Sequence, residues 1–143
     1  MKKFSFRLQR VLEWRDAQAR LEEGRLGVLR AAVQASESAI AAIAQESEVA
    51  SRQILTARSV SGEELAALGD HREQAIVRTM QLTLRRAEAQ RAVDFQLKKV
   101  ADRRREARLL ERLRERRLSE WRHASDREIE HQAAENYLLR WNR

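Results

Sequence analysis

The sequence contains no cysteine, which excludes a disulfide framework and a metal site built on thiolates. Nothing in it indicates an oxidising compartment, so we expect a cytoplasmic protein. It also contains no proline and only 4 glycines among 143 residues. Average usage predicts roughly seven prolines and ten glycines for this length. Turns must therefore be rare and helices long.

Aromatic residues are equally scarce. They make up 5% of the chain, whereas charged residues make up 36%. Such a composition fills a narrow seam between two helices, but not a globular core with a water-excluded pocket. The sequence also lacks a glycine-rich phosphate loop and a nucleophile elbow. We therefore expect a protein that is not an enzyme and that has no cofactor and no small-molecule substrate.

Two further features are too weak to predict a site or a targeting segment. His131 and Glu135 are four residues apart on one helical face, but a zinc site needs three or four ligands, so we expect no metal. The basic start resembles that of a signal peptide, but Arg7, Arg10 and Glu13 interrupt the apolar run that would have to follow. We expect neither a signal peptide nor a membrane span.

What the chain does contain is a hydrophobic repeat whose members are separated alternately by three and four residues, as in the seam of a coiled coil. The repeat consists of Leu26, Leu29, Val33, Ser36, Ile40, Ile43, Ser47, Ala50, Ile54 and Ala57. Before it, Gly24 and Gly27 predict either a gentle kink or only a locally weaker helix.

A helix start is encoded near residue 61. Ser61 can cap the free amides of a new helix while Glu64 reaches back to the cap, and Val60 and Leu65 sit where a hydrophobic staple would pack. We therefore predict an all-α fold with a single domain over residues 1–143: a helix at about 4–57, a turn at about 58–61, and one or more helices at about 62–140. The short connection predicts a long antiparallel two-stranded coiled-coil hairpin, monomeric in solution.

The second helical stretch has a less regular stripe of apolar residues, and the sequence leaves open whether it is one helix or two. A break would fall near Gly69 or near Arg85 and Arg86. The predicted stripe consists of Leu65, Leu68, Ile76, Met80, Leu84, Val93, Leu97, Val100, Ala107, Leu110 and Leu113.

A turn near residue 60 has a consequence for the C-terminus. Paired positions should sum to about 120, which places Leu8 opposite Arg112 and Phe4 opposite Arg116. Roughly the last 25 residues then project as a helical overhang without a partner helix. Exposed apolar residues there indicate either a partner-binding surface or a segment that folds back or self-associates. They are Leu118, Trp121, Ile129, Tyr137, Leu138, Leu139 and Trp141.

The net charge of +7 is concentrated at the same end of the chain. Residues 98–143 hold 14 Lys and Arg against 9 Asp and Glu. These cations are suited to nucleic acid phosphates or to an acidic protein surface. Interleaved acidic residues favour a solvated, ion-paired helix face instead, and nucleic acid is the least favoured of the three. The interleaved residues are Asp102, Glu106, Glu111 and Glu115.

Both ends of the chain resemble one known family. The N-terminal run FSFRLQRVLEWR (residues 4–15) resembles the FRLQxVLxxR opening of the FliJ family of flagellar export proteins. The C-terminal run LERLRERR (residues 110–117), with the later Glu-Trp-Arg and Asp-Arg-Glu triplets, resembles the arginine-rich tail of that family. Length, a central turn and the lack of proline agree with it as well.

The resemblance implies an antiparallel coiled coil that looks like the rotor shaft of rotary ATPases. Members of the family insert their open end into a hexameric export ATPase and promote its assembly and activity. They also contact the membrane protein of the export gate and escort export chaperones. The expected location is therefore cytoplasmic and peripheral at the membrane-associated export apparatus. The stalk of an injectisome, a nucleic-acid-binding coiled coil and a purely structural dimer stay open as alternatives.

The residues carried over by position, together with apolar residues of the overhang, form the predicted ATPase-binding set: Phe6, Arg7, Leu8, Arg15, Arg117, Leu118, Trp121, Arg127, Glu128, Glu135 and Trp141. Ala134 departs from an acidic pair that is common in the tails of the family. Near the turn, relatives have aromatic residues that meet the export gate. Here the corresponding positions hold Leu65, Leu68, His71 and Ala75, which weakens the prediction of a gate contact.

Overall fold

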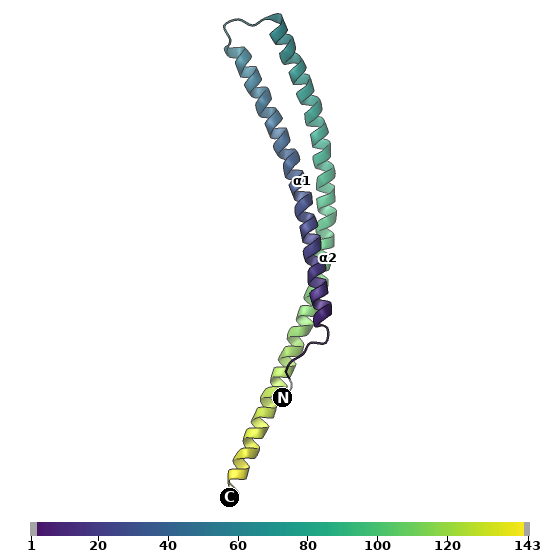
Figure 1. Cartoon of the computed structure of the whole chain (residues 1–143), viewed down its shortest axis with the longest axis vertical. Helices are drawn as coiled ribbons and strands as arrows, with labels where there is room; N and C mark the ends of the chain where they lie inside the picture. The colour runs from purple at the N-terminus through teal and green to yellow at the C-terminus, as the bar shows by residue number, and fades with distance from the viewer. Residues whose placement is uncertain (1–2, 142–143) are drawn as a thin grey trace. The chain divides into compact units, whose positions relative to one another are not determined.

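The computed structural model describes residues 3–141 and contains two helices and no strand within them (Figure 1). Helix α1 spans Gln9–Thr56 and helix α2 spans Gly62–Trp141, so residues 57–61 form the connection. The prediction of an all-α fold is confirmed. Gly24 and Gly27 lie inside α1, and Gly69 lies inside α2, which is one continuous helix.

The chain divides into two compact units, which are described separately. Residues 22–100 form one unit, here called the hairpin unit. The other, here called the terminal unit, combines the N-terminal residues up to Leu21 with the chain from Ala101 onward.

In the hairpin unit the two long helices pack together as a helical hairpin (Figure 1). Polar contacts along their length join them. Gln96 Nε2 donates to Glu22 Oε2 at 2.5 Å, Arg86 pairs with Glu37 at 2.7 Å, and Arg72 donates to Ser51 Oγ at 3.1 Å. These pairs sum to 118, 123 and 123, close to the value of 120 expected from a turn near residue 60.

The side of α1 that faces α2 is the side that the repeat predicted. From Leu26 to Ile54 every member of the repeat is buried or half-buried, and Ala57 is exposed because it lies just past the helix. The centre of the hairpin unit is formed by Leu26, Val93 and Val100, and Leu29 and Val33 pack against them.

The predicted stripe on α2 is wrong in the segment nearest the turn. Ile76, Met80 and Leu84 are 61%, 63% and 66% exposed. Steps of four residues turn 40° around a helix at 100° per residue, so such a row leaves the contact face. Leu68 is half-buried as predicted, but the other half-buried positions of this segment are His71, Ala75, Thr79, Leu82 and Ala89, which the predicted stripe did not include.

Helix α2 begins with the capping box that the sequence predicts. The amide of Glu64 donates to Ser61 Oγ at 3.1 Å, and the amide of Ser61 donates to Glu64 Oε2 at 2.8 Å. Each hydrogen bond satisfies an amide that has no partner within the helix. The cap fixes the residue at which the chain re-enters a helix and hence the length of the connection.

In the terminal unit, Leu12 and Ala19 of α1 and Ala107 of α2 are buried. Arg15 Nη1 lies 2.5 Å from Glu106 Oε2, which joins the two helices by an ion pair. The predicted start of the first helix near residue 4 is wrong, because α1 begins at Gln9 and residues 3–8 are not helical. The amide of Gln9 donates to the carbonyl oxygen of Phe6 at 3.0 Å, which tightens the entry into α1.

Among the described residues, one helix is long and apolar enough to cross a membrane. An 18-residue window of α1 has a mean hydropathy of 1.2. Only the length and composition of α1 favour a membrane-spanning helix, and core helices of soluble proteins meet the same criterion. Glu37 of this helix pairs with Arg86 of α2, so α1 presents an acidic residue to its partner helix.

Candidate functional site

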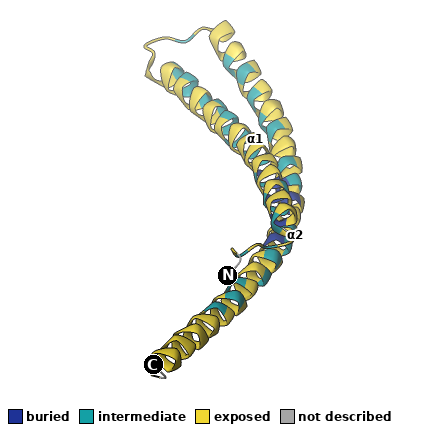
Figure 2. Ribbon diagram, turned by 60° about the horizontal axis from the view of Figure 1, so that its bottom comes forward, coloured by how far each residue is buried: buried dark blue, intermediate teal, exposed yellow. Residues whose placement is uncertain are grey.

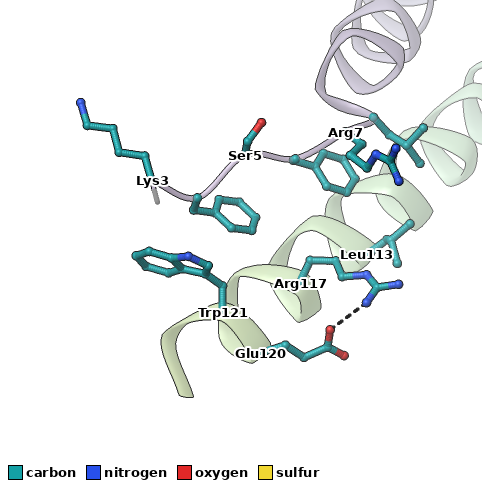
Figure 3. Close-up of a pocket in the computed structure, with 10 residues that line it drawn as sticks. Lys3, Ser5, Arg7, Leu113, Arg117, Glu120 and Trp121 are labelled. Carbon is teal, nitrogen blue, oxygen red and sulfur yellow. Dashed lines mark hydrogen bonds and ion pairs between the residues drawn. The ribbon is translucent and has the colours of Figure 1, made fainter. Parts of the chain in front are cut away.

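A hollow lies in the terminal unit, between the N-terminal segment (residues 3–8) and α2. Its volume is about 940 Å³. Figure 3 shows the segment running alongside α2, with Trp121 beneath it. The hollow is lined by Lys3, Phe4, Ser5, Phe6, Arg7, Leu8, Leu113, Arg117, Glu120 and Trp121.

An aromatic contact holds the N-terminal segment on α2. The rings of Phe4 and Trp121 have centroids 6.0 Å apart and an interplanar angle of 58°. This tilted geometry is favourable because the positive edge of one ring meets the negative face of the other. Phe4, Phe6 and Trp121 are all half-buried, so the segment and the indole shield each other from water.

The contact corrects the prediction that Phe4 lies opposite Arg116. An extended segment advances about 3.3 Å per residue, whereas a helix advances about 1.5 Å. Because residues 3–8 are not helical, they reach further along α2 than a helical segment of the same length would. Phe4 therefore meets Trp121, and the overhang begins later than predicted.

Basic side chains surround the apolar lining of the hollow. Lys3, Arg7 and Arg117 carry positive charge, and Arg117 Nη1 pairs with Glu120 Oε2 at 3.0 Å (Figure 3). Arg116 also pairs with Glu120, at 3.3 Å. The single carboxylate in the lining is thus shared by two guanidinium groups. The site is suited to a partner that inserts an apolar side chain and presents negative charge around it.

Beyond the hollow, α2 continues as a solvent-exposed helix. Residues 126–141, here called the C-terminal tail, are all exposed (Figure 2). Tyr137 and Trp141 stack on each other with centroids 6.3 Å apart and an interplanar angle of 28°. Ile129 is 59% exposed and Trp141 is 77% exposed. Large apolar groups so displayed on a helix are typical of a surface that meets another molecule.

The structure brings together five of the predicted ATPase-binding residues and separates the others. The five that line the hollow are Phe6, Arg7, Leu8, Arg117 and Trp121. Arg127, Glu128, Glu135 and Trp141 lie along the exposed tail. Leu118 and Trp121 are half-buried, so they do not belong to the uncovered overhang as predicted.

Arg15 and Glu135 of the predicted set form ion pairs outside the hollow. Arg15 is half-buried, pairs with Glu106, and its guanidinium carbon lies 4.9 Å from the centroid of the Trp14 ring. Glu135 lies 3.5 Å from Nδ1 of His131. Within residues 3–141 no group of three or more His, Cys, Asp or Glu side chains is placed to hold a metal ion.

Of the four positions predicted to meet the export gate, only Leu65 is largely exposed, at 54%. Leu68, His71 and Ala75 are half-buried on the side of α2 that packs against α1. The ring nitrogen Nε2 of His71 is buried without a hydrogen-bond partner in the structure. A gate contact through these three side chains would have to reach into the contact between the helices.

The sequence reasoning missed half of the hollow. The predicted binding set lacks Lys3, Phe4, Ser5, Leu113 and Glu120, and the prediction placed Phe4 in a helix. A signal was present, because Phe4, Phe6 and Leu8 alternate with Ser5 and Arg7. A period of two is typical of an extended segment that shows one face to the protein.

The hairpin unit is thus a pair of packed helices, and the terminal unit combines an aromatic hollow with an exposed helical tail. Comparisons of the chain with protein family models, with curated proteins and with solved structures give no match. A particular function therefore rests on the residues and on the resemblance of the two termini.

Proposed function

We propose that this protein is the non-enzymatic central stalk of a flagellar type III export apparatus, which binds the hexameric export ATPase and promotes its assembly and activity. The observation that carries the proposal is the exposed tail of α2, which continues past an aromatic hollow built by the N-terminal segment and residues 113–121 of α2. These are the two regions in which the sequence resembles the FliJ family. In this proposal the helices form an antiparallel two-stranded coiled coil.

The hollow and the tail have different tasks in the proposed complex. The tail carries stacked Tyr137 and Trp141, which would insert between subunits of a ring as an apolar anchor. The hollow presents Arg7 and Arg117 around an apolar floor, which suits an acidic segment of the ATPase. The export gate and export chaperones are further partners in the proposal, and the location is cytoplasmic at the export apparatus.

The test measures the hydrolysis rate and the oligomeric state of the cognate export ATPase at physiological salt, with and without the full chain. We expect stimulation and hexamer formation with the full chain. We expect both to be lost with a chain that ends at Ser125, because this variant lacks the exposed tail but keeps Phe4 and Trp121. Leu55→Ala is the matched control, since Leu55 is an 83% exposed apolar residue of the hairpin unit.

A full chain without any effect on the flagellar ATPase would contradict the proposal. The same assay with an injectisome ATPase then tests the closest alternative. Stimulation that persists after truncation at Ser125 would instead indicate that the ATPase binds the hollow and not the tail. The variants Phe4→Ala and Trp121→Ala would then test the hollow.

A second candidate is nucleic acid binding, favoured by one face of α2 in the terminal unit. Positions 105, 108, 112 and 116 lie within 80° of one another around the helix and all hold arginine. Arg105 pairs with Asp102 at 3.9 Å and Arg116 with Glu120, which offsets half of this charge. Binding of a fluorescent duplex that weakens steeply with salt would support this function, since each phosphate contact releases a counterion.

A further inference from the structure

The exposed apolar row on α2 in the hairpin unit has no role in the proposed function. It consists of Ile76, Met80 and Leu84, which are each more than 60% exposed. They occupy successive turns and are centred on Met80. The helix hairpin alone would leave this row in water.

The residues around Met80 match a second, reversed copy of the same helix, because an apolar residue then meets an apolar residue and each charge meets its opposite. Four residues away on either side are the aliphatic residues Ile76 and Leu84. Eight residues away on either side are the opposite charges Arg72 and Glu88. A helix face with this symmetry is complementary to a second copy of itself in the antiparallel orientation.

We propose that two copies of this protein associate through this face, with α2 of one copy crossing α2 of the other in antiparallel orientation at Met80. Ile76 of each copy then lies opposite Leu84 of the other. The steps of four residues match the ridges that interdigitate when two helices cross at about −50°. The proposal replaces the expectation of a monomeric hairpin and does not depend on the proposed function.

The charges select the antiparallel orientation. Arg72 and Glu88 lie 80° to either side of Met80 around the helix, at the edges of the row, where long side chains reach across to the partner. In the antiparallel pair each arginine meets a glutamate. In a parallel pair Arg72 would meet Arg72 and Glu88 would meet Glu88, which is repulsive. Arg72 donates one hydrogen bond, to Ser51 Oγ, and its other guanidinium N–H groups remain for the partner.

The surface beside the row has room for the partner's side chains. A hollow of about 400 Å³ lies next to Ile76 and Met80, between the two helices of the hairpin unit. Its lining includes the small side chains of Ala44 and Ala75 and the apolar side chain of Ile43. An aliphatic side chain of the second copy fits such an apolar hollow and displaces water from it.

Sedimentation velocity of the full chain over about 1 µM to 1 mM tests the association, because an interface smaller than about 1,200 Å² is usually weak. We expect a monomer that becomes a dimer as concentration rises. Met80→Asp should abolish the dimer without loss of helicity, and Leu55→Asp, a substitution at another exposed apolar position, should leave it intact. A monomer over the whole range would overturn the proposal.

A charge exchange tests the pairing. Glu88→Arg should weaken the dimer at least tenfold, because it places two arginines together at both edges. The double variant Arg72→Glu with Glu88→Arg restores opposite charges and should return the dissociation constant to within about threefold of the original. A double variant as weak as the single one would overturn the pairing.

Disulfide cross-linking tests the orientation, because the chain has no cysteine of its own. Met80→Cys should form a cross-linked dimer on oxidation, since the two positions meet at the crossing. Ile76→Cys should not, because in the antiparallel pair its two copies lie about 12 Å apart along the axis, beyond the reach of a disulfide. Equal cross-linking of both variants would indicate a parallel pair and overturn the proposal.

Discussion

At the scale of single residues, the hairpin unit contains one buried polar pair. Glu22 and Gln96 are 7% and 6% exposed. Gln96 Nε2 donates to both the carbonyl oxygen of Glu22, at 3.0 Å, and its carboxylate, at 2.5 Å. Arg25 Nη1 adds an ion pair to the same carboxylate at 3.1 Å. A buried polar pair of this kind fixes the register of two helices because any shift leaves the polar groups unsatisfied.

We expect Gln96→Leu to lower the free energy of unfolding by about 1–3 kcal/mol, because it removes the amide that satisfies a buried carboxylate. Urea unfolding followed by circular dichroism measures the change. Gln90→Leu, at an exposed position of the same helix, should have little effect. The double variant Glu22→Leu with Gln96→Leu should recover most of the loss. Equal stability of the Gln96 and Gln90 variants would show that the buried pair contributes nothing.

The ring contact of Phe4 leads to a prediction in the terminal unit. Phe4→Ala should free the N-terminal segment, because an aromatic pair contributes about 0.5–1.5 kcal/mol. Trypsin cleavage after Arg7 should then become about two to ten times faster, which mass spectrometry detects. Phe95→Ala removes an exposed ring of the hairpin unit and serves as the control. An unchanged cleavage rate in the Phe4 variant would mean that the aromatic contact does not hold the segment.

At the scale of the helices, the residue spacing on α1 sets which side is buried. Ile43 is half-buried in the contact with α2, whereas Leu55, on the same helix, is 83% exposed. Both side chains are aliphatic, so their different exposure results from their positions on the helix and not from their chemistry.

We expect Ile43→Asp to lower the thermal midpoint strongly, because it places a charge in the apolar contact between the helices. Leu55→Asp should leave the midpoint within about 2 °C of the original, since a substitution on the surface usually costs less than about 0.5 kcal/mol. Thermal melts by circular dichroism compare the two. Similar midpoints would contradict the contact face described here.

At the scale of the whole molecule, part of α2 is helical without packing against another part of the chain. The tail of α2, residues 126–141, is helical but wholly exposed. Removal of the chain after Ser125 should therefore reduce the total ellipticity and leave the thermal midpoint almost unchanged, because little apolar surface is buried there. A clear fall in the midpoint would show that the tail packs against the rest of the protein in solution.

The sequence alone determined the parts of this protein that depend on local chemistry. The absence of proline and the regular repeat from Leu26 to Ile54 predict long helices and identify the buried side of α1, because the side-chain period of a helix is fixed by its backbone. The capping residues Ser61 and Glu64 predict where α2 begins, because they interact within one turn.

The tertiary structure decided what depends on distant parts of the chain. Ile76, Met80 and Leu84 are as apolar as the buried residues, yet they are exposed, because the partner helix and the connection determine which side of α2 is covered. Phe4 meets Trp121 because the N-terminal segment is extended, and its reach along α2 depends on where α1 begins. The aromatic hollow exists only when these residues, more than a hundred positions apart, come together by folding.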